Sequence, residues 1–389
     1  MNVAVPLLAT ASAAGHVIYP TLLGLATWGK RQSDVGEPAF LPAVTVIIPA
    51  YLEANVIEEK IADIERQRYP AAIEIIVVAD DAQTSAAARR AGARVLHQRD
   101  RTGKSRAVNV GVAAASYDIV VLSDANVALA PGALELLARH FTDPTVGAVA
   151  GAKHVVDAAG QGFYWRFESW LKQRETLLGS TLGVVGELVA FRREAFRPLP
   201  EALVGDDLWL ALDMIEGGWQ VLLEPEARAL EYGSPTIHEE WERRTRIVAG
   251  TIDVIWRRRW LLVPGRSHIA GQLWGHKLLR STVGPVAHVA LLGSAAASVR
   301  RSRVAQLALL GHAVSGVALA HVARGGKVPR LLQMPVQVLF LQGVALGGLL
   351  RYLRGDRPSV WPKLERGALS ESATDRYTLG RRELARSAS

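Results

Sequence analysis

Acidic side chains lie next to apolar runs at three widely spaced points of the chain. The three groups are Asp80-Asp81, Asp124-Ala125-Asn126 and Asp206-Asp207. The first follows IEIIVVA, the second follows YDIVVLS, and the third precedes the apolar helical pattern LWLALDMI. Open α/β sheets bind ligands at the carboxyl ends of their strands, where such groups come together. The pattern predicts a nucleotide-dependent enzyme.

The Asp124-Ala125-Asn126 triplet offers oxygen ligands for a divalent cation. Two residues apart on an extended segment, Asp124 and Asn126 would project toward the same side, as ligands of Mg²⁺ or Mn²⁺ should. Asp and Asn also favour turns and helix caps, so a structural role is the alternative.

The Asp206-Asp207 pair is a candidate general base. Adjacent carboxylates at a helix start can act as caps, but two in succession exceed what one cap needs. Like charges held close together raise the pKa of one of them, which suits a group that removes a proton. We interpret the pair as catalytic, with capping as the alternative.

Gly103-Lys104-Ser105 contains the end of a phosphate-loop motif but not its beginning. The motif G-x-x-x-x-G-K-[ST] needs glycine at position 98, where this chain has Gln98. Lys104 at a helix start can still meet a phosphate, and a solvated helix start is the alternative. Pro49 to Glu53 and Asp80-Asp81, at neighbouring strand ends, are candidates to contact a base and ribose.

Alternating strands and helices are expected to position these residues. The runs VTVIIPA, IEIIVVA and YDIVVLS are predicted as strands buried on both faces, and ARVLHQ as a short strand. Helices are expected over Asn55–Arg68, Ser85–Ala91 and Ser105–Ala114. Helical crossovers between buried strands favour an α/β fold with a mixed, mostly parallel sheet over a sandwich.

The 389-residue chain is 49% hydrophobic, and its first 29 residues contain no Lys, Arg, Asp or Glu. That length fits one crossing of a hydrocarbon core about 30 Å thick. A cleaved signal peptide would need a basic start, whereas here Lys30 and Arg31 follow the apolar run, so we expect a retained anchor over 1–29. The positive-inside rule then places the catalytic domain, 40–255, in the cytoplasm of a plasma-membrane protein.

A second membrane region of two or three helices is expected over residues 281–350. Its uncharged runs are Ser281–Val299, Val304–Val322 and Leu331–Leu350. Residues 256–280 mix Trp with Arg and Lys, which predicts an amphipathic segment in the headgroup layer, with an ordinary surface helix as the alternative. Three spans would leave the basic tail, 351–389, outside the cell. Because that conflicts with the charge rule, either one run does not cross fully or the tail is an exception.

The net charge of +8 does not indicate nucleic-acid binding, because the Arg residues concentrate beside apolar segments and no recognition motif accompanies them. Contact with anionic membrane lipids explains this placement better. The chain has no Cys, which excludes disulfides, thiol catalysis and Cys-ligated zinc.

In their order along the chain, these motifs resemble the membrane-bound members of glycosyltransferase family 2, which have the GT-A fold and include catalytic subunits of bacterial polysaccharide synthases. The resemblance covers about Val44 to Arg280. Its strongest segments are VTVIIPAYLEA, IIVVADDAQT, GKSRAVNVG, VVLSDAN and VGDDLWLALDMIEGGW. It implies a metal-dependent, inverting hexosyltransferase with a nucleotide-sugar donor, and favours UDP because UDP is the family's commonest donor nucleotide.

The resemblance also implies roles for individual residues. The donor-binding residues are Pro49, Tyr51, Glu53, Asp81, Lys104, Asn109, Asp124, Arg244 and Arg246. Asp124 and Asn126 occupy the family's D-x-D motif, which binds Mg²⁺ or Mn²⁺ with the diphosphate. Asp207, beside Asp206, occupies the place of the general base.

Two further stretches have counterparts in the family. Gly111 belongs to a segment near the donor. Gly179–Phe196 resembles the acceptor-side stretch, with Gly186 and the pair Arg192-Arg193.

One departure from the family concerns the product. Processive members carry Q-x-x-R-W, whereas this chain has Arg243 to Ile247, and Ile247 lacks the flat ring that stacks on an acceptor sugar. We therefore expect a single addition to a saccharide or lipid-linked acceptor in envelope or exported polysaccharide or glycolipid synthesis. The alternatives are a processive polysaccharide synthase and a noncatalytic membrane scaffold. The three short hydrophobic runs leave little room for a complete polymer channel, so we expect a partner transporter or self-association.

Overall fold

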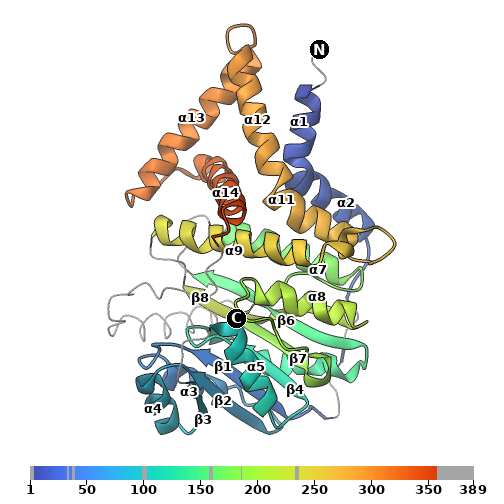
Figure 1. Cartoon of the computed structure of the whole chain (residues 1–389), viewed down its shortest axis with the longest axis vertical. Helices are drawn as coiled ribbons and strands as arrows, with labels where there is room; N and C mark the ends of the chain where they lie inside the picture. The colour runs from blue at the N-terminus through green and yellow to red at the C-terminus, as the bar shows by residue number, and fades with distance from the viewer. Residues whose placement is uncertain are drawn as a thin grey trace. The chain divides into compact units, whose positions relative to one another are not determined.

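The computed structural model describes residues 4–32, 35–36, 40–98, 103–156, 161–184, 186–232 and 236–356. These residues form two compact units (Figure 1). We call residues 29–156 and 165–232 the sheet unit, and residues 4–28, 161–164 and 236–356 the helical unit. The predicted tail lies outside the described residues after position 356.

The sheet unit contains an eight-stranded sheet in the order β3-β2-β1-β4-β7-β6-β8-β5. Its strands are β1 (Val44–Ala50), β2 (Ile73–Ala79), β3 (Arg94–His97), β4 (Ile119–Ser123), β5 (Ala128–Leu129), β6 (Val146–Val156), β7 (Leu188–Arg192) and β8 (Gln220–Tyr232). Strands β3, β2, β1 and β4 are parallel, as are β6 and β8, whereas β7 is antiparallel to both β4 and β6. Strand β5 is antiparallel to β8. The carboxyl ends of β1, β2 and β4 therefore share one edge of the sheet.

Helices cover both faces of the parallel strands. The helices of this unit are α3 (Ile57–Glu65), α4 (Ala82–Arg90), α5 (Lys104–Ala114), α6 (Ala133–Ala138), α7 (Gln161–Thr176, in this unit from Trp165) and α8 (Asp206–Glu216). Val46 and Ile48 of β1 belong to the same buried cluster as Ile61 of α3. Ile47 faces α5 instead, because a Cβ at Gly111 would lie only 2.6 Å from its Cγ2. Successive strand residues point to opposite faces, so an unbroken apolar run is buried on both sides.

The predicted elements agree with this architecture. VTVIIPA and IEIIVVA are β1 and β2 with the expected bounds, and YDIVVLS contains β4. The helix expected over Asn55–Arg68 is shorter, Ile57–Glu65. Its start is displaced because the residues just before it form a turn after β1.

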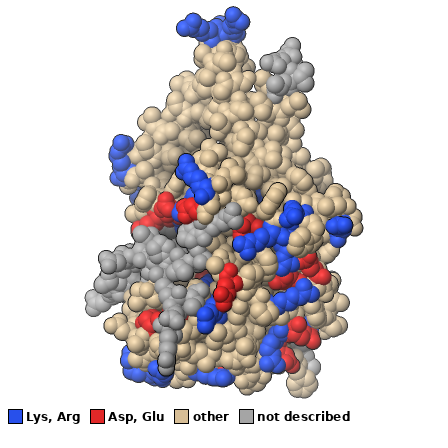
Figure 2. Space-filling view, viewed as in Figure 1, with Lys and Arg blue, Asp and Glu red and all other residues tan. Residues whose placement is uncertain are grey.

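The helical unit consists of the N-terminal helices and all elements after β8. Its helices are α1 (Ala4–Ala13), α2 (Tyr19–Ala26), α9 (Ile237–Arg257), α10 (Ala270–Gln272), α11 (Leu279–Ser281), α12 (Val283–Ser298), α13 (Arg303–Ala323) and α14 (Arg330–Leu353). Three stretches are long and apolar enough to cross a membrane: Val5–Ala26, Arg303–Ala323 and Arg330–Leu353. Helix α12 is apolar but has only 16 residues. Arg300 and Arg301 lie in the α12–α13 connection, and Arg303 begins α13. Figure 2 shows a group of basic residues at the top of a largely uncharged surface.

Helix α14 packs closely on α9 through small residues. A Cβ at Gly348 would lie 2.5 Å from the Cβ of Val248, and one at Gly347 would lie 3.1 Å from the ring of Trp241. Arg351 Nη1 donates to Glu242 Oε2 at 2.8 Å. Gly343 and Gly347, four residues apart, both lie against the Trp241 ring, and small residues at this spacing let two helix backbones approach each other.

Residues 256–280, predicted as an interfacial segment, form the end of α9 and a series of short helical turns. Trp256, Trp260 and Trp274 are exposed there, and the guanidinium of Arg259 lies 5.6 Å from the Trp256 ring. Exposed Trp beside Arg is typical of a membrane interface. The interfacial placement stays a prediction.

Candidate active site

Lys104 and Asp124 form the centre of a charged group at the carboxyl end of β4. Lys104 Nζ donates to Asp124 Oδ1 at 2.7 Å and to the carbonyl oxygen of Gly186 at 3.4 Å. Gly103 precedes Lys104 with φ +86°, a conformation that favours glycine, and starts α5. A Cβ at Gly186 would lie 3.1 Å from Nζ, so glycine leaves room for the lysine side chain.

The charges of two further carboxylates, Glu187 and Asp206, act on this pair. Burial raises the pKa of Asp124; the Lys104 charge opposes that rise, and the charges of Glu187 and Asp206 add to it. Burial alone would lower the pKa of Lys104, but the charges of Asp124 and Asp206 outweigh it and raise the pKa. We call Lys104, Asp124, Glu187 and Asp206 the strand-end cluster. Sequence analysis missed Glu187, although a charged residue directly before the apolar strand LVAF was a usable signal.

Glu187 also joins the cluster to buried charges on β6 and β8. Lys153 on β6 forms ion pairs with both Glu187 and Glu231, and its side chain is 2% exposed. The Lys153 ammonium lies 4.8 Å from the Trp165 ring centre. These contacts hold Glu187 in place beside Asp124.

The Asp124-Ala125-Asn126 triplet is a turn, so the expected extended geometry is wrong. Val127 N donates to the Asp124 carbonyl at 3.4 Å, and Ala125 is buried. Asp and Asn favour such turns because their short polar side chains bond nearby backbone. The metal role of Asn126 consequently rests on the motif and stays a prediction.

Asp81 organises the loop that follows β1. Its Oδ2 accepts from Leu52 N at 2.7 Å, and its Oδ1 accepts from Thr84 N at 2.8 Å, which caps α4. Thr84 Oγ1 accepts from Glu53 N at 2.8 Å. Leu52 has φ +53°, a strained conformation held by these bonds.

Four of the predicted donor residues thus lie together at the ends of β1 and β2. They are Pro49, Tyr51, Glu53 and Asp81, all half-buried. The parallel register that pairs Ala50 with Ala79 brings the two strand ends side by side.

Asp206 and Asp207 begin α8 after Gly205, whose φ is +92°. Asp207 Oδ1 accepts from Leu208 N at 2.8 Å, so this carboxylate also satisfies a free N–H at the helix start. Both side chains are half-buried. Asp207 therefore makes a capping contact. The charge of Asp206 acts on Lys104 in the cluster and raises its pKa.

Two residues of the α5 motif, Asn109 and Gly111, make contacts within the sheet unit, and their expected place near the donor stays a prediction. Asn109 Nδ2 donates to the Leu199 carbonyl at 2.9 Å, and its Oδ1 accepts from Leu199 N at 2.8 Å. Gly111 lies against Ile47 and Val78 of the sheet. The i, i+2 spacing of Asn109 and Gly111 does not indicate these contacts, because the two residues have different neighbours: Asn109 bonds to Leu199, and Gly111 packs on the sheet.

Arg192 ends β7 and Arg193 follows it; the acceptor-side role that the resemblance implies for them stays a prediction. Strand β7 runs antiparallel to β4, with Leu188 paired to Ser123 and Arg192 paired to Ile119. Arg192 therefore lies beside the start of β4, at the end of the strand away from Asp124. Arg192 donates to the carbonyls of Val146 and Phe141. An antiparallel strand carries its last residues away from the edge where it started.

Arg244 and Arg246 lie on α9 in the helical unit. Arg244 is buried, bonds to Glu240, and has its guanidinium 4.5 Å from the Tyr164 ring centre. Arg246 is half-buried and Ile247 is exposed. The donor-binding roles of the two arginines stay predictions.

A divalent cation fits the chemistry of the cluster. Within the described residues no group of three or more His, Asp and Glu side chains forms a closed metal site. Mg²⁺, however, commonly takes one or two carboxylates together with substrate phosphates and water. Asp124, whose carboxylate already binds the Lys104 cation and has two further carboxylates acting on it, is suited to such an open site.

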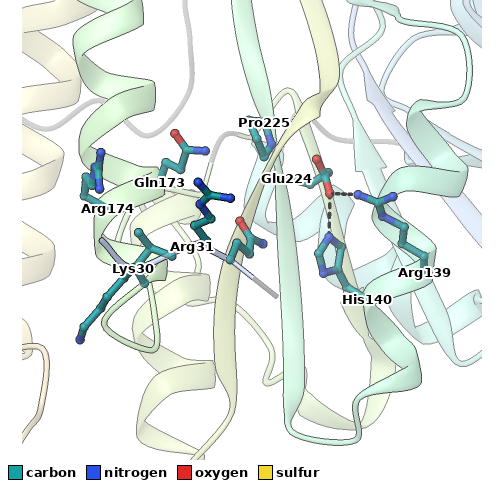
Figure 3. A pocket seen from close by; sticks show the side chains of 10 residues that line it. Lys30, Arg31, Arg139, His140, Gln173, Arg174, Glu224 and Pro225 are labelled. Carbon is teal, nitrogen blue, oxygen red and sulfur yellow. Dashed lines mark hydrogen bonds and ion pairs between the residues drawn. The ribbon is translucent and has the colours of Figure 1, made fainter. Parts of the chain in front are cut away.

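A separate pocket of about 400 Å³ lies elsewhere in the sheet unit and shares no residue with the cluster (Figure 3). Its charged lining consists of Lys30, Arg31, Arg139, His140, Arg174 and Glu224. Glu224 Oε2 accepts from Arg139 Nη2 and from His140 Nε2, both at 2.8 Å. We call this the basic pocket.

Comparisons with known proteins agree with the geometry. Residues 45–199 match the family model Glycosyl transferase family 2. The fold is similar to that of mannosyltransferase PcManGT from Pyrobaculum calidifontis, solved in complex with GDP-Man and Mn²⁺, with a TM-score of 0.73 and 25% identity. That likeness covers 90% of this chain and 99% of the other.

Two sequence relatives match smaller shares of this chain. The uncharacterized protein MT1568 of Mycobacterium tuberculosis is 28% identical over 299 residues, 68% of this chain and 90% of that protein. The poly-beta-1,6-N-acetyl-D-glucosamine synthase of Staphylococcus aureus is 23% identical over 244 residues. The match covers 59% of this chain and 58% of that synthase, less than two thirds of its length.

Proposed function

Because residues 45–199 form a glycosyl transferase family 2 domain with the GT-A fold, we propose that this protein is a membrane-anchored, inverting, metal-dependent hexosyltransferase. It transfers one sugar from a nucleotide-sugar donor to a saccharide or lipid-linked acceptor. The catalytic domain lies on the cytoplasmic side of the plasma membrane, where nucleotide sugars are made.

The observation that carries the proposal is the strand-end cluster. Lys104 and Asp124 meet at 2.7 Å at the carboxyl end of β4, and the charges of Glu187 and Asp206 act on them. A cationic side chain beside an acidic group suits a diphosphate with its metal. The half-buried residues of the Asp81 loop supply the adjoining surface for base and ribose.

In the proposed reaction, Asp207 removes the proton from the acceptor hydroxyl. The acceptor oxygen then forms a bond to the anomeric carbon as the bond from that carbon to the β-phosphate oxygen breaks, so the configuration inverts. Lys104 stabilises the negative charge that develops on the departing diphosphate. When bound at Asp124, the Mg²⁺ or Mn²⁺ ion supplies Lewis-acid stabilisation of the same leaving group.

The donor nucleotide is a choice between UDP and GDP. UDP is favoured by the family at large, while the similar archaeal mannosyltransferase was solved with GDP-Man. Both classes of donor therefore belong in the first assay.

A processive polysaccharide synthase is the second candidate. Similarity to the staphylococcal poly-N-acetylglucosamine synthase favours it. Ile247 argues against it, because this exposed aliphatic residue stands where the processive motif has Trp. The length of the product separates the two candidates.

The deciding experiment measures nucleoside diphosphate release by detergent-purified protein with Mn²⁺, across UDP-sugars and GDP-sugars and with membrane lipid extract as acceptor. We expect release from one donor, and loss of at least about a thousandfold in Asp207→Asn. Glu216→Gln, on the same helix, is the matched control and should keep full activity. If no donor reacts and none binds, the noncatalytic scaffold replaces this proposal.

A further inference from the structure

Lys60 is a buried cation directly beneath the Asp124 turn. Its side chain is fully buried on α3. The ammonium donates to Ser123 Oγ at 2.7 Å and to the Val127 carbonyl at 2.8 Å. Ser123 precedes the Asp124-Ala125-Asn126 triplet and Val127 follows it, so one side chain bridges both ends of the turn.

Burying this ammonium is costly, because water no longer solvates the charge. Burial lowers the pKa of Lys60 to about 8, and the charges of Asp63 and Asp124 act in the opposite direction. An apolar residue would fill the position at a lower cost in desolvation. The presence of a lysine here is consequently better explained by its two hydrogen bonds, which fix Ser123 and Val127 at the ends of the turn.

The same face of α3 contacts the chain after the turn. Asp63 Oδ2 accepts from Leu129 N at 2.9 Å, and Gln67, just beyond the helix, accepts from Ala133 N at 3.1 Å. Residues spaced by three and four along a helix share one face. Of these three side chains, Lys60 is the one that donates to both Ser123 and Val127, the residues that flank the triplet.

We propose that Lys60 is a positioning residue that fixes the Asp124 turn in the shape that receives the divalent cation and the donor diphosphate. This inference rests on the proposed function. Ser123 Oγ also donates to the Glu187 carbonyl at 3.2 Å, so Lys60 connects the turn to a second member of the strand-end cluster. A turn held in advance loses less conformational freedom when its ligands bind.

The test is a titration of full-length protein with Mn²⁺ and UDP or GDP, whichever the wild type binds, followed by electron paramagnetic resonance of the free ion. In Lys60→Met, which keeps the length of the side chain and removes its donors, we expect Mn²⁺ affinity to fall about tenfold. Gln67→Met is the matched control, because it removes a buried hydrogen bond from the same surface without touching the turn. Its Mn²⁺ affinity should stay within about twofold of wild type.

Four outcomes are decisive. A folded Lys60→Met protein with wild-type Mn²⁺ affinity overturns the inference, and so does an equal loss in Gln67→Met. If Lys60→Met does not fold, Ser123→Ala removes one partner of the ammonium, and unchanged Mn²⁺ affinity in that variant overturns the inference too. A wild-type protein that binds no Mn²⁺ with either nucleotide overturns the metal-dependent function itself.

Discussion

The strand-end cluster and the basic pocket are both charged regions of the sheet unit, but their positive and negative side chains are arranged differently. In the cluster, three carboxylates act on Lys104, and two of them raise its pKa most strongly. In the basic pocket, Arg139 and His140 enclose the single buried carboxylate of Glu224 (Figure 3). The carboxylates of the cluster thus repel one another, since Glu187 and Asp206 raise the pKa of Asp124, whereas in the pocket the inner carboxylate is paired with two basic side chains.

This difference indicates where a ligand is needed. Lys60 holds the Asp124 turn and Lys153 holds Glu187, so the carboxylates cannot move apart to relieve their repulsion. A bound cation would relieve it. In the basic pocket the outer cations, Lys30 and Arg31, are exposed and already solvated by water. We therefore expect substitutions in the cluster to affect chemistry and those in the pocket to affect stability.

The largest effect is expected from Asp124→Asn. Losing the carboxylate removes the metal ligand while keeping the shape of the turn, so kcat/KM should fall by at least about a thousandfold. Asp118→Asn changes an exposed carboxylate just before the same strand and is the matched control. Steady-state assays of nucleoside diphosphate release measure both. Comparable losses in the two variants would show that the cluster has no special role.

Lys104→Met should have the next largest effect. A charge-assisted hydrogen bond contributes about 1.5–3 kcal/mol, so we expect the Kd for the nucleoside diphosphate to rise about tenfold to a hundredfold. Arg106→Met removes an exposed cation two residues further along α5 and should leave the Kd within about twofold. Isothermal titration calorimetry measures both values. Equal weakening in the two variants would mean that net charge, and not the position of Lys104, governs binding.

The parallel half of the sheet could be predicted from the sequence because its signals are local. Runs such as VTVIIPA are too short and too apolar for a surface helix, and the helices between them fix a parallel order. The antiparallel strand β7 could not be ordered in this way. Its position between β4 and β6 depends on long-range pairing, which leaves no periodic signal.

The candidate site was predictable where the motif residues follow strands directly. Asp81, Lys104 and Asp124 lie as expected at strand ends or at a helix start. Contacts between residues distant in sequence could not be predicted, such as those of Arg192, which donates to carbonyls about fifty residues away. Lys60 was not predicted as a site residue, because a lysine in a helical pattern is usually solvated and its contact with the Asp124 turn is not visible in the sequence.

Glu224→Gln tests the stability side of the comparison. Burial opposes ionisation of Glu224, but bonds from His140, the Glu226 backbone and Arg139 outweigh it and lower the pKa. As the pH falls, the Glu224 carboxyl is protonated at a higher pH in the unfolded chain than in the folded protein. The ionised carboxylate therefore stabilises the fold above the ordinary pKa of Glu, and this stabilisation is lost as the pH falls through the pKa of the folded state. We expect the variant to lose about 1–2 kcal/mol at pH 7 and less at about pH 4. Thermal midpoints at the two pH values check this, and an equal loss at both would contradict it.

The smallest effect is expected from Lys30→Ser combined with Arg31→Ser. Both side chains are exposed, and an exposed charge contributes about 0–1 kcal/mol, which salt screens further. Thermal midpoint, Mn²⁺ affinity and kcat/KM should all stay close to wild type in detergent. A fall in kcat/KM without a change in the thermal midpoint would show that the basic pocket binds an anionic part of the substrate. The contrast between a catalytic cluster and a structural pocket would then be wrong, because both charged regions would bind a ligand.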